Sequence, residues 1–241
     1  MRLDVALTPA AVTPAALAGA TALVVDVLRA STSLVTALAH GAREAVPVGE
    51  VEDARRVAAA RVGALLAGER GGDPPVGFDL GNSPLEFTRE RVGGRTLVFT
   101  TSNGTRALLA ARRAAAVGIA GFVNLTAAAD WACGQGRDVV VVCAGELGER
   151  SFEDEVCAGL LIERMRVLEP GAVLAPTGAR AAATARPYAR DVGRLARDAP
   201  HARHLTERGR GPDVAACMRL DAFALVPVYR ADVDKVVLPY G

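Results

Sequence analysis

Short runs of β-branched and other apolar residues alternate with stretches rich in Ala and Leu along most of the chain. The alternation predicts strands at 22–28, 45–48, 64–67, 96–101, 138–143, 223–228 and 236–238, and helices at 31–40, 51–62, 105–113 and 153–168. Strands that alternate with helices favour parallel pairing through right-handed crossovers, with helices on both faces of the sheet. The sequence therefore predicts an α/β fold: a three-layer α/β/α sandwich with a mainly parallel sheet, made mixed by its last two strands.

The chain has 241 residues, which is enough for one substantial hydrophobic core. The stretch 170–212 is rich in Ala, Arg, Gly and Pro and shows no clear periodicity, but no repeat or low-complexity tail separates one part of the chain from another. We therefore expect a single catalytic domain over residues 1–241.

The balance of charge excludes some classes of partner. The formal net charge is +1, so no general positive field recruits nucleic acid or an anionic membrane. The N-terminus lacks the pattern of a signal peptide, and no apolar run is long enough to cross a bilayer. The four cysteines are far apart, as reduced thiols in the cytoplasm would be. We expect a cytoplasmic homodimer without nucleic-acid or membrane partners.

The first polar junction follows the predicted strand 22–28. Asp26 lies inside an apolar run, where a carboxylate is unfavourable unless it is paired or binds a metal. Arg29, Ser31 and Thr32 then lead into a helix, and they offer hydrogen-bond donors and the positive end of a helix dipole to a phosphate. An ordinary helix cap with an Asp–Arg ion pair explains the same residues, so both interpretations stay open.

The second junction is a long glycine-rich loop. Glu69, Arg70 and Gly71 begin it, and Asn82 and Ser83 lie near its end. Glycines allow close approach of the backbone to a ligand, and long loops with charged and amide side chains are often functional. The loop favours substrate binding, with a solvated turn as the alternative.

The third junction directly follows the predicted strand 96–101. Thr101, Asn103, Gly104, Thr105 and Arg106 form a turn of hydroxyl, amide and glycine residues before a helix. This is a general anion-binding arrangement. The G-x-x-x-x-G-K-[ST] pattern is absent, which argues against hydrolysis of ATP or GTP.

The fourth junction is acidic. Glu146 follows the predicted strand 138–143, and Glu153, Asp154 and Glu155 begin the next helix. Three acids at a helix start complement the helix dipole, so capping alone could explain them. If the carboxyl end of this strand lies near Asp26, the same acids could instead hold Mg²⁺ through oxygen ligands.

The sequence lacks the motifs of two known ways to hydrolyse a phosphate ester. Neither Cys143 nor Cys157 has an Arg at the spacing of a Cys-based phosphatase loop, and Leu28 stands where an aspartyl-phosphate D-x-D motif needs its second acid. The histidines form no dense metal-binding motif, and solvated positions explain His201 and His204 better than substrate contact. Carboxylate-bound Mg²⁺ with arginine support remains.

An ordered set of motifs spans most of residues 22–228: VVDVLRASTSLVTAL, GERGG…GFDLGNSPLEF, TTSNGTRAL, CAGELGERSFEDEVCAG and HL…G…DV..C..LD..ALVPV. The set resembles the 2-phosphosulfolactate phosphatase family. The resemblance implies an α/β/α fold and Mg²⁺-dependent hydrolysis of 2-phospho-3-sulfolactate to 3-sulfolactate and phosphate, a step toward coenzyme M. A phosphatase of another small phosphorylated hydroxy acid and a non-catalytic anion-binding regulator are the alternatives.

From these patterns we assign hypothetical roles. The catalytic candidates are Asp26, Arg29, Glu69 and Arg70. The candidates for binding a small anionic phosphorylated substrate are Ser31, Thr32, Gly71, Asn82, Ser83, Thr101, Asn103, Gly104, Thr105 and Arg106. The candidate Mg²⁺ ligands are Asp26, Glu69, Glu153 and Asp154. The sequence leaves open whether Asp26 is a metal ligand, a general base or a nucleophile.

Overall fold

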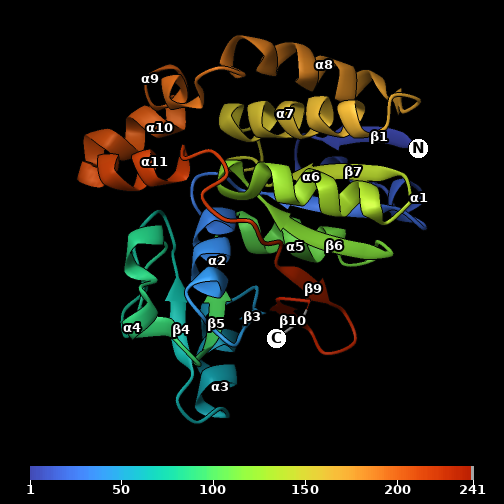
Figure 1. Ribbon diagram of the computed structural model, residues 1–241. Helices are drawn as coiled ribbons and strands as arrows, with labels where there is room; N and C mark the ends of the chain where they lie inside the picture. The colour runs from blue at the N-terminus through green and yellow to red at the C-terminus, as the bar shows by residue number, and fades with distance from the viewer. Residues whose placement is uncertain (240–241) are drawn as a thin grey trace.

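The computed structural model describes residues 1–239, which form a mixed α/β domain on a ten-stranded sheet (Figure 1). The strand order is β4-β5-β3-β10-β9-β6-β2-β7-β1-β8. Within the described residues, three neighbouring pairs are antiparallel, and all involve β9 or β10. The predicted α/β fold with a mainly parallel, mixed sheet is confirmed.

The elements have the following bounds. The strands are β1 Arg2–Ala6, β2 Thr21–Val25, β3 Glu44–Pro47, β4 Leu65–Gly68, β5 Thr96–Thr100, β6 Ala116–Ala120, β7 Val139–Cys143, β8 Val173–Leu174, β9 Val228–Arg230 and β10 Lys235–Val237. The α-helices are α1 Pro14–Leu17, α2 Ala30–Ala39, α3 Val51–Ala59, α4 Arg89–Val92, α5 Gly104–Ala111, α6 Leu125–Gly134, α7 Phe152–Leu168, α8 Pro176–Ala185, α9 Leu195–Asp198, α10 Pro200–Leu205 and α11 Gly211–Cys217.

Two apolar cores, one on each face of the sheet, explain the layered arrangement. Along β2, Leu23 and Val25 point into the core shared with α6, α7 and α8. Ala22 and Val24 point into the other core, shared with α2 and α5. Successive side chains of a strand face opposite sides, so a strand covered by helices on both faces is apolar throughout.

Most predicted elements agree with the structure to within a few residues. The predicted strand 223–228 is wrong, because the chain has no regular structure before β9 begins at Val228. The predicted strand 22–28 is also too long, since β2 ends at Val25 and leaves Asp26 just beyond its carboxyl end. The strands β1, β6 and β8 and the helices α1, α4, α6 and α11 were not predicted, and the stretch 170–212 contains the helices α8, α9 and α10 and the first two residues of α11.

The sheet consists of two parallel blocks joined by the β9–β10 hairpin. One block is β4-β5-β3, and the other is β6-β2-β7-β1-β8. In Figure 1, β4 and β5 run steeply in the view, whereas β6, β7 and β1 run across it. The loops after β2, β4, β5 and β7 nevertheless line one cavity, so both blocks contribute their carboxyl ends to one region. In the described part of the chain, no helix is long and apolar enough to cross a membrane.

Candidate active site

A cavity of about 230 Å³ lies where the two blocks of the sheet meet. It is lined by Asp26, Leu28, Arg29, Glu69, Gly71, Gly72, Asn82, Ser102, Asn103, Glu146, Leu147, His201, His204, Leu205 and Arg208. These residues follow the carboxyl ends of β2, β4, β5 and β7 or lie in the segment that contains α10. Ligands of open α/β sheets bind at such strand ends, so we take this cavity as the candidate active site.

Asp26 lies at the inner wall of the cavity and is 7% exposed. Its Oδ1 accepts a hydrogen bond from the Ala30 backbone N–H at the start of α2, at 3.1 Å. The pKa of Asp26 is raised to about 7, chiefly by burial and also by the nearby Glu69 carboxylate, while the Ala30 N–H and Arg29 lower it in part. Asp26 is therefore poised to change its protonation near neutral pH, as a catalytic acid or base requires.

Two further acids, Glu153 and Asp154, lie beside Asp26 at the start of α7, and both are almost fully buried. The pKa of Glu153 is raised to about 7, chiefly by burial and also by the Glu146 and Asp26 carboxylates. Burial, Asp26 and Glu153 also raise the pKa of Asp154. Because each carboxylate disfavours ionisation of its neighbours, a cation bound at the cluster would favour the ionised forms.

The two acids differ in what their oxygens contact. Both oxygens of Asp154 accept backbone N–H groups, from Val27 at 2.8 Å and Gly145 at 3.2 Å, so Asp154 fastens two strand-end loops together. In contrast, Oε2 of Glu153 is buried and has no hydrogen-bond partner among the described residues. An orphaned carboxylate oxygen is unfavourable unless something absent from the protein atoms satisfies it.

Asp26 and Glu153 suit Mg²⁺, which takes most of its ligands from water and substrate, better than a metal whose ligands all come from the protein. Across residues 1–239, no group of three His, Cys, Asp or Glu side chains is arranged to hold an ion. Magnesium is usually bound through one or two carboxylates, with water and substrate phosphate completing its ligands. Asp26 and the orphaned oxygen of Glu153 match that donor set in chemistry and in charge.

Glu69 has a different position from the one expected of a metal ligand. Its Oε1 accepts the Ser102 backbone N–H at 2.7 Å, and its Oε2 accepts the Gly72 N–H at 2.8 Å and the Ser102 hydroxyl at 3.2 Å. The carboxylate therefore ties the glycine-rich loop to the turn after β5. We assign Glu69 to shaping the cavity wall, and its expected role as a Mg²⁺ ligand stays a prediction.

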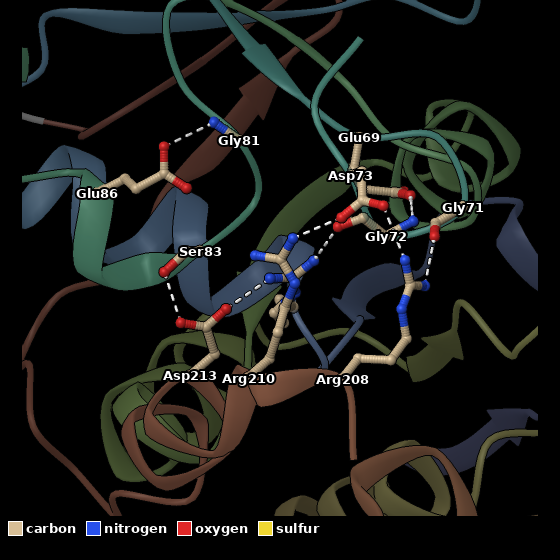
Figure 2. Close-up of polar contacts among 11 residues, drawn as sticks. Glu69, Gly71, Gly72, Asp73, Gly81, Ser83, Glu86, Arg208, Arg210 and Asp213 are labelled. Atoms are coloured by element: carbon tan, nitrogen blue, oxygen red, sulfur yellow. Dashed lines mark hydrogen bonds and ion pairs between the residues drawn. The ribbon is translucent and has the colours of Figure 1, made fainter. Parts of the chain in front are cut away.

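Arg29 brings a buried positive charge to the cavity, and its side chain is 2% exposed. Its Nη1 donates to Asp213 Oδ2 at 2.5 Å, and its Nη2 donates to the Gly72 carbonyl at 2.8 Å. Asp213 Oδ1 in turn accepts the Ser83 hydroxyl at 2.6 Å, as Figure 2 shows. A guanidinium has five N–H donors, so donors remain for an anion in the cavity.

A second cavity of about 270 Å³ adjoins the first and shares Ser102, Asn103 and Leu147 with it. Arg70 and Arg106 both line this second cavity. Hydrogen bonds to the carbonyls of Glu69 and Gly49 hold the Arg70 guanidinium in place. The pair of arginines makes this cavity suited to an anionic group.

The structure brings most of the predicted site residues to these two cavities. The first is lined by Asp26, Arg29, Glu69, Gly71, Asn82 and Asn103, and the second by Arg70, Thr101, Asn103 and Arg106. Of these, Asn82 also has a buried Oδ1 without a partner among the described residues, so this acceptor is free for a hydrogen-bond donor or a cation.

Other predicted binding residues lie outside both cavities and make internal contacts. The Ser31 hydroxyl accepts the Asp26 backbone N–H, and the Thr32 hydroxyl donates to the Val27 carbonyl. Thr105 accepts the Thr101 backbone N–H with its hydroxyl. Ser83 contacts Asp213 rather than the cavity. These hydroxyls shape the strand-end turns, which is the capping interpretation of the same sequence pattern.

Gly104, the first residue of α5, packs tightly against the first junction. A Cβ atom at this position would lie 2.5 Å from the Ala30 Cβ and 2.7 Å from Asp26 Oδ2. Real Cβ atoms do not approach other atoms so closely. The glycine is therefore required for close approach of two helix starts beside the Asp26 carboxylate, and its expected role in substrate binding stays a prediction.

The sequence analysis missed part of the cavity wall. His201 and His204 line the cavity, and Arg208 lines it as well; as expected for a solvated position, His204 is exposed, whereas His201 is partly buried. His201 Nδ1 lies 3.4 Å from Glu146 Oε1 and 3.6 Å from Glu153 Oε1. The apolar residues of 170–212 show no periodicity that would indicate which side chains face the cavity. The clustering of histidines and arginines in this stretch is the one sequence feature that could have indicated them.

One family of known proteins matches almost the whole chain. The family model described as 2-phosphosulpholactate phosphatase matches residues 6–232. The chain belongs to this family. The 2-phosphosulpholactate phosphatase model covers all the strand-end loops that line the cavity, so the resemblance seen in the ordered motifs is confirmed.

Individual members of the 2-phosphosulpholactate phosphatase family are similar over most of their length. A probable 2-phosphosulfolactate phosphatase of Caldanaerobacter subterraneus subsp. tengcongensis is 38% identical over 208 residues, which cover 85% of this chain and 86% of the relative. One from Thermotoga petrophila is 38% identical over 211 residues, 86% of this chain and 88% of the relative. One from Clostridium acetobutylicum is 35% identical over 238 residues, 95% of this chain and 97% of the relative.

Proposed function

We propose that this protein is a Mg²⁺-dependent phosphatase that hydrolyses 2-phosphosulfolactate to 3-sulfolactate and phosphate, a coenzyme M biosynthesis-type step. One observation carries the proposal: a buried arginine and a carboxylate with a pKa near neutrality, Asp26, line one cavity, and the orphaned carboxylate oxygen of Glu153 lies close to Asp26. The names of the family and of its members supply the substrate. The arrangement of charge supplies the chemistry.

The first cavity suits the phosphoryl group. Arg29 presents guanidinium donors there, and Asn82 lines the same cavity with a side-chain amide whose NH₂ group is a donor. A guanidinium binds phosphoryl oxygens with matched, charge-assisted hydrogen bonds. Because these groups are fixed by the surrounding loops, they hold the phosphoryl group in position and stabilise the negative charge of the transition state.

The second cavity suits the remaining anionic groups of the substrate. Phosphosulfolactate carries about four negative charges when its phosphate is fully ionised, and the sulfonate and carboxylate need cations of their own. Arg70 and Arg106 lie in the adjoining cavity. We assign them to the sulfonate and carboxylate end of the substrate.

The acids Asp26 and Glu153 would hold Mg²⁺, which supplies charge neutralisation at the phosphoryl oxygens and a more acidic water. Asp26 also lines the cavity with a pKa raised to about 7. In its ionised form it can orient the attacking water or accept its proton. Direct attack by Asp26 on phosphorus is the competing mechanism, and trapping of a phosphorylated enzyme would distinguish the two.

The test is phosphate release from 2-phosphosulfolactate by the purified protein. We expect turnover with Mg²⁺, no turnover with EDTA, and a fall in kcat of about 100-fold or more for Asp26→Asn. Asp130→Asn is a matched control, because Asp130 is half exposed on α6 and pairs with Arg164. Turnover of Asp26→Asn at the wild-type rate would show that the central role of Asp26 is wrong.

The choice of substrate is tested on the same preparation. Phospholactate and phosphoglycerate test the alternative that another small phosphorylated hydroxy acid is the substrate. A protein that binds phosphosulfolactate in calorimetry but releases no phosphate would be a regulator and not an enzyme.

A further inference from the structure

We propose that Asp213 is a positioning residue for catalysis, which acts from α11 with Ser83 to orient the Arg29 guanidinium toward the phosphoryl group. This inference rests on the proposed phosphatase function, because it concerns the same cavity. It concerns Asp213, which is buried and lies outside both cavity linings. Asp213 therefore affects the substrate only through Arg29.

The contacts of Asp213 form a short chain that ends at Arg29. Ser83 Oγ donates to Asp213 Oδ1 at 2.6 Å, and Arg29 Nη1 donates to Asp213 Oδ2 at 2.5 Å. The Gly72 carbonyl accepts from Nη2 of the same guanidinium at 2.8 Å. Two fixed acceptors on two terminal nitrogens define the plane of the guanidinium, so its remaining N–H groups have a set direction.

The surrounding charges explain why this orientation needs a dedicated partner. Arg29 shares its cavity with the carboxylates of Asp26 and Glu69. Within the described residues, its ion pair is with Asp213 and with neither of these two acids. A buried guanidinium without Asp213 would turn to the nearest carboxylate. Asp213 thus keeps Arg29 available for the substrate and keeps Asp26 available for metal and water.

A second contact joins the same two segments without touching Arg29, and it provides a control. Asp73 in the glycine-rich loop pairs with Arg208 at 2.7 Å and with Arg210 at 2.6 Å, as Figure 2 shows. The side chain of Asp73 is about half exposed, whereas that of Asp213 is 8% exposed. If Asp213 only docked α11 onto the loop, loss of Asp73 would have a similar effect on catalysis.

The experiment is a double-mutant cycle between Asp213→Asn and Arg29→Lys, read as kcat/KM for phosphate release. A displacement of about 1 Å at a reacting group can lower a rate about 100-fold, so we expect Asp213→Asn to lose about 30- to 100-fold. The double variant should fall within about threefold of Arg29→Lys alone, because Asp213 has no function without the guanidinium. Losses that multiply would overturn the proposal.

Two further variants keep the test decisive. Asp73→Asn should stay within about threefold of wild type, and a loss equal to that of Asp213→Asn would overturn the positioning role. If Asp213→Asn fails to fold, Ser83→Ala replaces it in the cycle, with an expected loss of about three- to tenfold from one missing hydrogen bond. Losses that multiply in that cycle would also overturn the proposal.

A failure of the proposed function would be recognised separately. If the wild-type protein releases no phosphate, the phosphatase proposal fails. The double-mutant cycle between Asp213→Asn and Arg29→Lys is then repeated with the dissociation constant of inorganic phosphate, measured by calorimetry, in place of kcat/KM. Coupled losses of phosphate affinity in Asp213→Asn and Arg29→Lys would support the orientation of Arg29 by Asp213. Independent losses would refute it.

Discussion

Replacement of Gly104 by alanine tests whether the close packing of α2 against α5 positions Asp26. The new Cβ would lie 2.5 Å from the Ala30 Cβ, whereas apolar carbons pack at about 3.5–4.0 Å. One helix start must therefore move by about 1 Å. Overpacking of a well-packed site costs about 1–3 kcal/mol, and alanine regains up to about 1 kcal/mol over glycine in a helix. We expect a net loss of about 1–2 kcal/mol in the free energy of unfolding.

The same movement should affect catalysis, because the new methyl group would also lie 2.7 Å from Asp26 Oδ2. A shift of about 1 Å at this carboxylate predicts a fall in kcat of about 100-fold. Urea unfolding followed by circular dichroism measures the stability, and phosphate release measures the rate.

Gly134→Ala is the matched control. Gly134 also lies in a helix, α6, but no atom lies within 4 Å of its hypothetical Cβ. This variant should keep wild-type activity and should lose no stability. If Gly104→Ala matched Gly134→Ala in both stability and rate, the argument that packing positions Asp26 would be refuted.

Three further predictions concern charge, ligand binding and burial. The pKa of Glu153 is raised from 4.5 to about 7, chiefly by burial, so the metal-free protein should lose stability as pH rises through this window. In EDTA, Glu153→Gln should be more stable than wild type by about 1–3 kcal/mol at pH 8 and similar to it at pH 4.5. Urea unfolding that shows no pH-dependent difference between the two proteins would contradict this. Arg106→Ala should raise KM about tenfold or more with a smaller change in kcat, because Arg106 lies in the second cavity. An unchanged KM would show that Arg106 does not bind the substrate. A thiol reagent should label Cys133 alone in native protein and all four cysteines in denaturant, because the other three are buried; rapid native labelling of Cys143 would contradict the core described above.

The fold could be predicted where a strand is rich in β-branched residues and bounded by polar turns. The run at Val139–Cys143 met these conditions and forms β7. In contrast, β6 at Ala116–Ala120 consists largely of small residues, and only its neighbours in the sheet establish that it is a strand. The stretch 223–228 has β-forming residues but irregular backbone, so tertiary contacts override propensity there.

The residue types at the candidate site could be predicted from the sequence, but the contacts of the individual side chains could not. Unusual polar residues at strand ends indicated Asp26, Arg29 and Asn82, which line the cavity, because buried polar groups need a partner or a function. The sequence could not show that Glu69 binds backbone N–H groups, since that contact joins loops distant in the chain. The cytoplasmic location, the homodimer and the absence of a nucleic-acid partner stay predictions.

The β9–β10 hairpin has a consequence for biosynthesis. The two parallel blocks of the sheet join through a hairpin that ends at Val237, and the pocket draws its walls from both blocks. A nascent polypeptide must therefore emerge from the ribosome as far as Val237 before the hairpin can join the two blocks. Enzymatic competence then arises in a single late event, and a prematurely terminated translation product has a half-built, inactive pocket.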